Sequence, residues 1–419
     1  MRRTLDRRHF SISGVAPGEV LVASTFPHPD RGIVECPAAL LAAAGMQPSG
    51  LALRRKPVSP GGGEAILHTV SYVDPSGQVV GLGVAVHRDD RRTVDLAEEV
   101  VLAWAKVMRT RRVLVEATGP SCAGLRREAA MLARIPGPVA VLAPVAEQRD
   151  VPFPWPRHDG HVVERLADVP DGTTVVLPAH GVAPNMAAAA RARAATGRID
   201  VVDTTCPLVT RAHATARRFA DDGSIVVVIA GPGHAATPPL ASQTPTSTVV
   251  TSVEEIDGLA IDPPARVTFV VEPGVAVEDA GVLARHLRSR FAGTIGQHPD
   301  EYCYAASDRR ATVRAVASCS ELTLVLGTPD SPDTRTLLNA AADVGSRVQQ
   351  LDDLGELRPE WLEPVTSVGI LVGATAQPDL AGELVEILSG IGPVSLTRRH
   401  VTTEVQHTDP VPIVTRRAG

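Results

Sequence analysis

Short runs of β-branched and aliphatic residues alternate along most of the chain with alanine-rich stretches of helical periodicity. Near-continuous apolar runs are typical of strands that are buried on both faces of a parallel sheet. The predicted strands are residues 113–117, 173–177, 225–230, 267–271, 322–326 and 368–372. The predicted helices between them are residues 124–133, 184–195, 208–220, 280–291, 308–318 and 335–344. This alternation predicts an α/β protein made of stacked units with parallel sheets.

The first 108 residues follow a different pattern. Proline and glycine interrupt the apolar positions repeatedly, most densely in residues 48–65, and a predicted helix at residues 95–108 ends the segment. We therefore predict a separate N-terminal domain at residues 1–108, with a mixed sheet and a role that the pattern does not indicate. The predicted α/β units that follow are residues 109–198, 199–298 and 299–419, the last with a C-terminal tail.

Composition narrows the class of protein. Of the 419 residues, 44% are hydrophobic and 21% are charged, which is typical of a globular protein. The net charge of −6 and the 3% of aromatic residues disfavour a nucleic-acid surface that stacks bases. No run of about 18 apolar residues predicts a membrane span, and no apolar stretch follows the N-terminal arginines as a secretory leader requires. The only lysines, Lys56 and Lys106, lie outside any GK[ST] phosphate loop, which excludes Walker-type nucleotide hydrolysis.

Three of the five cysteines share a local context. Cys122, Cys206 and Cys303 each precede a predicted helix, and they are spaced by about the length of one predicted unit. Helix N-termini favour thiolates, and the ends of parallel strands direct side chains into a shared cleft. Equivalent units packed around one axis would therefore bring three thiolates to one point, where they could hold an iron–sulfur cluster with one open iron. The alternative is three unrelated buried cysteines.

The two other cysteines carry less information. Cys36 lies between an extended run and an apolar helix, so it is either a degenerate copy of the same junction or a buried thiol. Cys319 ends a predicted helix, and we expect it to fill the core. An odd number of cysteines without a leader sequence is expected in the reducing cytoplasm, and no CxxC pair predicts a zinc ribbon.

Several segments, in their order along the chain, resemble the IspH (LytB) family of 4-hydroxy-3-methylbut-2-enyl diphosphate reductases. They are SCAG at 121–124, AHGV at 179–182, DTTCPLVTRAH at 203–213, GPGH at 231–234, CYAASDR at 303–309 and GATAQPD at 373–379. The resemblance covers roughly residues 111–401. It implies a trefoil of three α/β units around a [4Fe-4S] cluster, whose three ligands by position are Cys122, Cys206 and Cys303.

The resemblance also implies a reaction. Members of the family are cytoplasmic oxidoreductases of isoprenoid biosynthesis. In them the open iron binds the substrate hydroxyl, which leaves as water after two electrons and protons are supplied. The implied partners are a small-molecule substrate, a diphosphate in the family, and an external electron donor such as ferredoxin or flavodoxin. No membrane or nucleic-acid partner is expected.

Five positions match the family's substrate residues. His180 and His234 match two family histidines and are the candidate catalytic and substrate-binding residues. Ser331 and Asp333 fall in the family's SSNS segment, and Thr375 takes the place of a serine. All five are predicted to contact the substrate.

Four departures from the family pattern affect that prediction. Ala236 stands where the family has its proton-relay glutamate, and residues 271–274 read VEPG in place of TQTT. Asp333 replaces an asparagine, and Glu147 aligns with a third histidine. Two like charges ~4 Å apart repel by about 4 kcal/mol at a partly screened site, so added carboxylates oppose diphosphate binding. Loss of a general acid typically costs about 100- to 10,000-fold in rate.

These departures predict a divergent member of the family. Its substrate is either the standard diphosphate or a related allylic alcohol. The alternative function is that of a non-catalytic iron–sulfur or small-molecule binding protein, such as a redox sensor.

Overall fold

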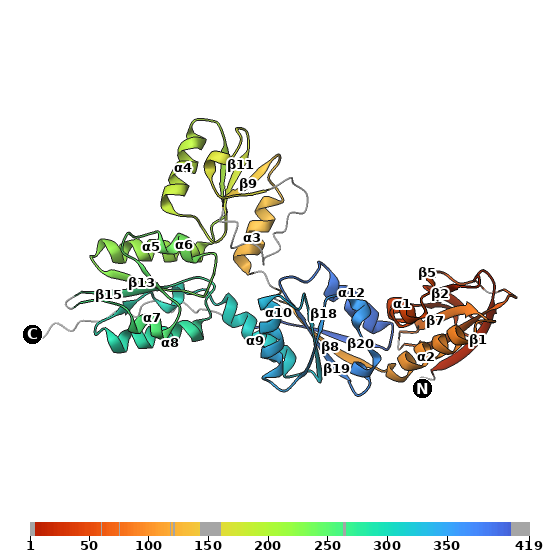
Figure 1. Cartoon of the computed structure of the whole chain (residues 1–419). Helices are drawn as coiled ribbons and strands as arrows, with labels where there is room; N and C mark the ends of the chain where they lie inside the picture. The colour runs from red at the N-terminus through yellow and green to blue at the C-terminus, as the bar shows by residue number, and fades with distance from the viewer. Residues whose placement is uncertain are drawn as a thin grey trace, which may run out of the picture. The chain divides into compact units, whose positions relative to one another are not determined.

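The computed structural model describes residues 5–403, apart from residues 60, 75, 118, 120, 121, 143–160, 263 and 264. The chain forms two compact units, whose elements are labelled in Figure 1. The first unit comprises residues 1–120 and 312–400, and the second comprises residues 121–311 and 401–419. Within the described part of the chain, no helix combines the length and the apolar character needed to cross a bilayer.

The first unit begins with a seven-stranded sheet. Its strands are β1 (Asp6–Ile12), β2 (Glu19–Ala23), β3 (Thr25–His28), β4 (Gly32–Glu35), β5 (Ala52–Lys56), β6 (Ala65–Val73) and β7 (Val79–His87). Strands β1, β6 and β7 pair in antiparallel fashion, whereas β2 and β5 pair in parallel. The mixed sheet predicted for this part of the chain is therefore confirmed.

Helices α1 (Ala39–Met46) and α2 (Arg91–Val107) accompany this sheet. The helix predicted at residues 95–108 is α2, and it begins four residues earlier because Asp90 caps it by accepting the N–H of Thr93 at 3.2 Å. Its apolar face buries Ala97, Val101 and Trp104 in the same core as the strands. The rest of the helix is polar, as expected for a helix covering one side of a sheet.

The first unit also contains a five-stranded sheet in which every strand is parallel to its neighbours. The strand order is β18-β17-β19-β8-β20. The strands are β8 (Arg111–Glu116), β17 (Leu322–Leu326), β18 (Arg347–Leu351), β19 (Ser367–Val372) and β20 (Val394–Arg399). The helices are the later part of α9 (Ala305–Ala317), which begins in the second unit, and α10 (Pro332–Ala342), α11 (Pro359–Leu362) and α12 (Leu380–Ser389). Strand β17 is buried at every position, as its continuous apolar run predicts.

The place of β8 corrects one detail of the sequence interpretation. The run at residues 113–117 was assigned to the predicted unit 109–198, but β8 pairs with β19 and β20. An apolar run indicates a buried strand without indicating its neighbours, so periodicity cannot assign it to a sheet. The buried guanidinium of Arg111 helps hold β8 there, because it donates to the carbonyl oxygens of Ile391 and Leu362, each at 3.4 Å. The boundaries of the four predicted domains stay a prediction.

The second unit contains two four-stranded parallel sheets. The first has the order β10-β9-β11-β12 and the second the order β14-β13-β15-β16. The strands are β9 (Val139–Leu142), β10 (His161–Val163), β11 (Thr174–Leu177), β12 (Asp200–Asp203), β13 (Ile225–Ile229), β14 (Thr248–Val250), β15 (Val267–Val271) and β16 (Ile295–Gly296). The helices are α3 (Ala123–Leu132), α4 (Pro184–Ala195), α5 (Pro207–Asp221), α6 (Thr237–Ala241), α7 (Val253–Asp257) and α8 (Val277–Arg290).

Helices cover both faces of the second of these sheets. Helices α5 and α6 lie on one face, and α7 and α8 lie on the other (Figure 1). Alternate residues of β13 accordingly belong to two cores: Val226 packs with Phe219 of α5, whereas Val227 packs with Leu283 of α8. This two-sided burial explains the unbroken apolar sequence of β13.

Candidate active site

The three cysteines singled out by their context all lie at helix starts in the second unit. Cys122 is the N-cap of α3, and its sulfur accepts the N–H of Leu125 at 3.5 Å. Cys206 is the N-cap of α5 and has extended backbone angles. Cys303 lies two residues before α9, and all three thiols are partly buried. Each of the three cysteines therefore precedes a helix in the structure, as predicted.

Two of these thiols lie close to Gly124. A Cβ atom at Gly124 would lie 3.2 Å from the sulfur of Cys206 and 3.6 Å from the sulfur of Cys122. The missing side chain therefore leaves open the space beside both sulfurs. Cys303 shares this environment: burial raises its pKa, and the nearby thiols of Cys122 and Cys206 raise it further.

The donor set suits a metal cluster. Three soft sulfur ligands are typical of iron–sulfur and zinc sites, and a cation removes the mutual repulsion that raises the Cys303 pKa. Backbone N–H groups of Ala305 and Gly274 bond to the Cys303 sulfur and lower its pKa, which stabilises a thiolate.

The other two cysteines stand apart from this group. Cys36 is buried in the core of the first unit, where burial raises its pKa to about 12, so it is a neutral core thiol. Cys319 is exposed, which contradicts the expectation that it fills the core. Helix α9 ends at Ala317, and Cys319 falls in the turn that follows, beyond the buried face of the helix.

A buried glutamate, missed by the sequence interpretation, ties the site loops together. Glu128 on α3 is 2% exposed, and its carboxylate accepts the N–H of Ala179 at 3.1 Å and the hydroxyl of Thr204 at 3.0 Å. Burial raises its pKa, and these two bonds act in the opposite direction. Glu128 thus joins the helix that begins at Cys122 to the loops that carry His180 and Cys206.

His180 follows β11 in a loop that turns at Gly181, whose φ is +79°. A Cβ at Gly181 would lie 2.8 Å from the ring of His213, so the motif glycine is required both by the turn and by this contact. Burial, together with a smaller effect of nearby His234, lowers the pKa of His180 to about 4, so the ring is neutral at pH 7. The rings of His180 and His234 lie edge to face with centroids 5.2 Å apart.

His234 contacts a carboxylate that the sequence interpretation did not assign to the site. Its Nδ1 lies 2.5 Å from Oε1 of Glu272, which follows β15. The other carboxylate oxygen accepts the N–H of Gly231 at 3.0 Å and the hydroxyl of Thr237 at 2.9 Å. Glu272 is 1% exposed. The only signal in the sequence was an acidic residue directly after a buried strand, in the segment that departs from TQTT.

Ser331, Asp333 and Thr375 come together in the first unit, at the carboxyl ends of β17 and β19. Ser331 caps α10, and the hydroxyl of Thr375 accepts the N–H of Thr328 at 2.9 Å. The carboxylate of Asp333 accepts the N–H of Ala374 at 2.7 Å. The structure therefore gathers these three residues in one loop group, whereas the cysteines and histidines belong to the second unit. Glu147 lies outside the described residues.

The chain is similar to a known protein family. The family model described as LytB protein matches residues 113–389, which is more than half of the chain. The chain belongs to the LytB family. Residues before 113 lie outside the matched range.

Relatives and solved structures agree with this assignment. A 4-hydroxy-3-methylbut-2-enyl diphosphate reductase of Mycobacterium bovis is 31% identical over 302 residues, which cover 70% of this chain and 90% of the relative. The enzyme of the same name from Leifsonia xyli is 32% identical over 288 residues, covering 67% of this chain and 84% of the relative.

The solved structure of the corresponding reductase from Plasmodium falciparum matches with a TM-score of 0.55 and 18% identity, covering 72% of this chain and 95% of that one. A second structure of the reductase, described as the terminal enzyme of the non-mevalonate pathway, matches with a TM-score of 0.51 and 20% identity, covering 67% of this chain and 99% of that one. These likenesses show that the chain has the LytB trefoil fold of α/β units.

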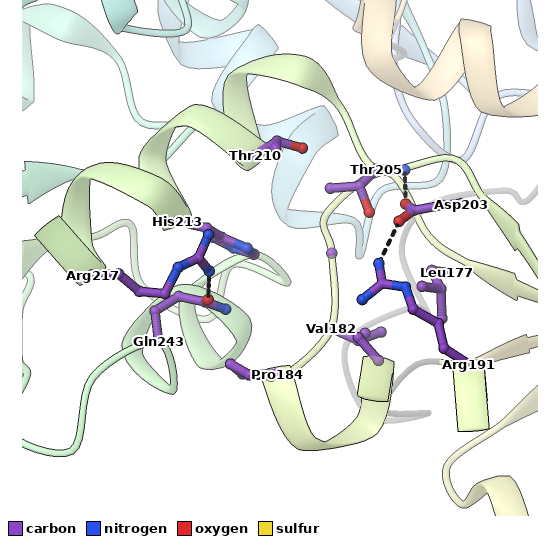
Figure 2. A pocket seen from close by; sticks show the side chains of 12 residues that line it. Leu177, Val182, Pro184, Arg191, Asp203, Thr205, Thr210, His213, Arg217 and Gln243 are labelled. Atoms are coloured by element: carbon purple, nitrogen blue, oxygen red, sulfur yellow. Dashed lines mark hydrogen bonds and ion pairs between the residues drawn. The ribbon is translucent and has the colours of Figure 1, made fainter. Parts of the chain in front are cut away.

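A cavity of about 340 Å³ lies beside the LytB motif at residues 203–213. Figure 2 shows Arg191 and Asp203 paired at 3.1 Å on one side of it, and Arg217 bonded to Gln243 on the other. The residue next to Cys206, Thr205, lines the cavity, but none of the eight predicted site residues does. The cavity thus borders the loops that carry His180 and Cys206, without being lined by either residue.

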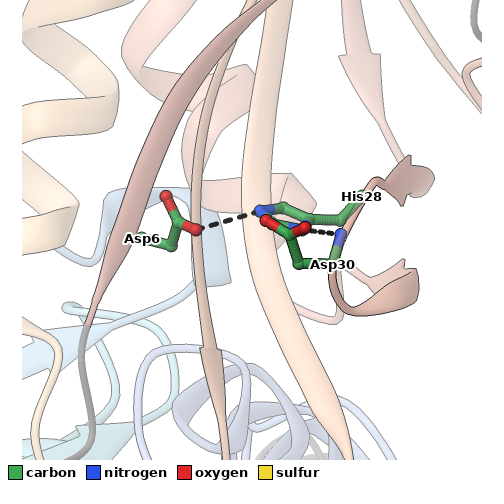
Figure 3. Close-up of side chains that lie close together, drawn as sticks. All are labelled: Asp6, His28 and Asp30. Carbon is green, nitrogen blue, oxygen red and sulfur yellow. Dashed lines mark hydrogen bonds and ion pairs between the residues drawn. The ribbon is translucent and has the colours of Figure 1, made fainter.

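A second group of potential metal ligands, Asp6, His28 and Asp30, lies on the N-terminal sheet, outside the LytB match (Figure 3). Arg8 pairs with Asp6 at 3.1 Å and with Asp30 at 2.6 Å, so a guanidinium already supplies the positive charge. The Nδ1 atom of His28 accepts the N–H of Asp30 at 3.2 Å. Ion pairing accounts for this cluster without a metal.

Proposed function

We propose that this LytB protein is an iron–sulfur reductase that removes the hydroxyl group of an allylic alcohol. The substrate is 4-hydroxy-3-methylbut-2-enyl diphosphate or a related compound. The observation that carries the proposal is the closeness of Cys122 and Cys206 beside Gly124, with Cys303 near enough for both thiols to raise its pKa, in a chain whose relatives bear that enzyme name.

In this proposal the three cysteines hold a [4Fe-4S] cluster. Such a cluster, with three protein ligands, keeps one iron open as a Lewis acid and passes electrons one at a time. The chain's own contribution begins with Gly124, which leaves space beside two sulfurs. The N–H groups of Ala305 and Gly274 stabilise the charge on the third sulfur, that of Cys303.

His180 and His234 are the proposed substrate-facing residues near the cluster. A neutral His180 donates or accepts one hydrogen bond, and it does not bring a fixed positive charge. His234 is fixed on its Nδ1 side by Glu272, so its Nε2 is available to the substrate. The overall reaction consumes two protons and two electrons for each allylic alcohol and yields a hydrocarbon chain end and water. The electrons come from an external one-electron carrier of the ferredoxin or flavodoxin kind.

Ser331, Asp333 and Thr375 are the proposed residues for the rest of the substrate. The hydroxyl of Thr375 can donate to an anion, but the carboxylate of Asp333 repels one. A negative charge in this loop group supports a substrate that is less charged there than a diphosphate. This is the reason for keeping a related allylic alcohol in the proposal.

One observation favours a second candidate function, a non-catalytic cluster-binding or redox-sensing protein. Ala236 is completely buried at the position of the family's proton-relay glutamate, so no acid reaches the site from there. A sensor needs the cluster but no proton donor.

Anaerobic purification with iron and sulfide analysis, followed by EPR of the reduced protein with and without the diphosphate, tests these functions. Cys122→Ser, Cys206→Ser and Cys303→Ser should each lose the cluster. Cys319→Ser is the matched control, because its thiol is exposed and it belongs to the first unit. Turnover of the diphosphate supports the reductase, and a cluster that is indifferent to it supports a changed substrate. A parent protein without a cluster contradicts both candidate functions.

A further inference from the structure

The buried carboxylate of Glu272 is a fully satisfied acceptor. Its three contacts are His234 Nδ1, the N–H of Gly231 and the hydroxyl of Thr237. An ionised carboxylate only accepts hydrogen bonds, so this arrangement requires a proton on Nδ1 of His234. The N–H of Ala236 also points at Nδ1, but at 3.3 Å it is the weaker contact. The carboxylate therefore sets the tautomer of the ring.

Because Nδ1 of His234 is held by Glu272, the direction of the other ring nitrogen, Nε2, is determined as well. The side chain of His234 is 31% exposed, whereas that of Glu272 is fully buried. A Cβ at Gly274 would lie 2.5 Å from Nε2 of His234, so the missing side chain keeps that nitrogen clear. Gly274 also donates its N–H to the sulfur of Cys303. Nε2 is thus on the side of the ring that faces the cysteine site.

Glu272 stands at a different position in the sequence from the family's proton-relay glutamate. The family pattern has its glutamate two residues after the histidine, where this chain has Ala236. In this chain the acid is Glu272, which directly follows β15, lies 38 residues after His234 in the sequence and bonds to its ring. Among the described residues, the titratable groups in contact with His234 are Glu272 and the neutral ring of His180.

We propose that Glu272 is the positioning residue that makes His234 the proton donor to the leaving hydroxyl. The proposal rests on the proposed function. In the step, the imidazolium of His234 gives its Nε2 proton to the substrate oxygen, the allylic C–O bond breaks, and water leaves. Two electrons from the external one-electron carrier and one proton from solvent complete the new C–H bond. The neutral imidazole keeps its Nδ1 proton, which stays bonded to the carboxylate of Glu272.

The decisive variant is Glu272→Gln, which keeps the size of the side chain but removes its charge. We expect the holoenzyme to lose about 100-fold in kcat, at the low end of the range for general acid catalysis, with little change in KM. The loss should be larger at high pH than at low pH, because a histidine without its carboxylate is protonated less readily. A purely structural role would leave the shape of the pH profile unchanged.

The matched control is Asp257→Asn. Asp257 pairs with Nε2 of His286 at 2.7 Å in the same unit, away from the cysteines, so this variant makes the same acid-to-amide change at another histidine. It should turn over like the parent. Normal iron content and EPR spectra in both variants would show that the cluster site is intact.

Nitrogen-15 NMR of the full chain labelled at histidine separates this proposal from the proposed function. The parent should show His234 protonated at Nδ1, and Glu272→Gln should change that signal while Asp257→Asn does not. If the parent has a cluster but does not turn over the diphosphate, its substrate is a different one, and an unchanged His234 signal in Glu272→Gln overturns the pairing in either case. Parent-like turnover by Glu272→Gln overturns the catalytic role whatever the spectra show.

Discussion

Two regions of the molecule place a carboxylate where the family pattern has none, and they use it differently. Glu272 in the second unit bonds to an imidazole, which can carry a positive charge. Asp333 in the first unit bonds to the backbone N–H of Ala374, a contact that closes a loop. In our proposals the added acid assists proton transfer in one region and changes anion binding in the other. The partner of the carboxylate decides between these effects.

The same contrast extends to how the two regions are built. In the second unit, Glu128 and Gly124 connect the segments that carry Cys122, His180 and Cys206. The loop group of Ser331, Asp333 and Thr375 is closed by bonds between two neighbouring strand ends. We therefore expect substitutions in the second unit to abolish function, and substitutions in the first to change which substrate is used.

The largest effect is expected from Gly124→Val. The added side chain would fill the space beside the sulfurs of Cys206 and Cys122, so the protein should lose most of its iron. Iron and sulfide per chain are the measurements. The control is Gly382→Val in α12, where a Cβ meets no atom within 4 Å. Full iron content in Gly124→Val would show that the cysteines do not share one site.

A smaller effect is expected from Glu128→Ala. Removing this carboxylate leaves the N–H of Ala179 without its buried acceptor, whereas the hydroxyl of Thr204 keeps the carbonyl oxygen of Leu177 at 2.8 Å. At about 1–3 kcal/mol for an unsatisfied buried group, the free energy of unfolding of the second unit should fall by roughly 1–3 kcal/mol. Urea unfolding measures this, and an unchanged midpoint would contradict the bracing role.

Acid should destabilise the second unit through His213. Burial lowers the pKa of this ring to about 4, with a further contribution from Arg217, whereas the unfolded chain binds the proton near pH 6.5. Its contribution to stability is complete above pH 6.5 and is lost as the pH falls from 6.5 to 4. At pH 5 the loss should be about 1–2 kcal/mol relative to pH 7.5. Unfolding of His213→Gln should depend less steeply on pH, and an equal slope would argue against a buried neutral ring.

The smallest effect is expected from Asp333→Asn, which restores the amide of the family pattern. If this loop group meets the substrate's anionic end, removing the charge should lower the KM for the diphosphate by about 10-fold, or roughly 1.4 kcal/mol. The kcat should change little, because Asp333 has no part in the proposed proton transfer. A higher KM would show that the carboxylate favours this substrate.

The sequence allowed most of the central strands to be predicted from their continuous apolar runs, as for β13, but the central four-residue strand β9 was missed. Edge strands of two to four residues, such as β14 and β16, were missed, since so few residues carry no periodicity. The sheet to which β8 belongs depends on its partners, and local pattern does not contain them.

The site divides in the same way. The cysteines and histidines were predicted from motif and position, and the structure brings Cys122, Cys206 and Cys303 together. Glu128 and Glu272 were missed, because a carboxylate is buried only when its partners are present, and those partners come from distant segments. Cys319 was wrongly expected in the core, since a helix end read from sequence is uncertain by one turn, which decides between core and surface.

The central place of β8 has a consequence for synthesis of the chain. Its neighbours β19 and β20 emerge from the ribosome about 250 residues later, so at roughly 5–20 residues per second β8 waits for about 10–50 s. During that interval an apolar strand has both edges unpaired and is exposed to wrong pairing. The second unit, whose strands lie close together in sequence, can be complete before β8 finds its sheet. A nascent chain halted near residue 330 should therefore bind chaperones through residues 111–116 while its second unit already resists protease.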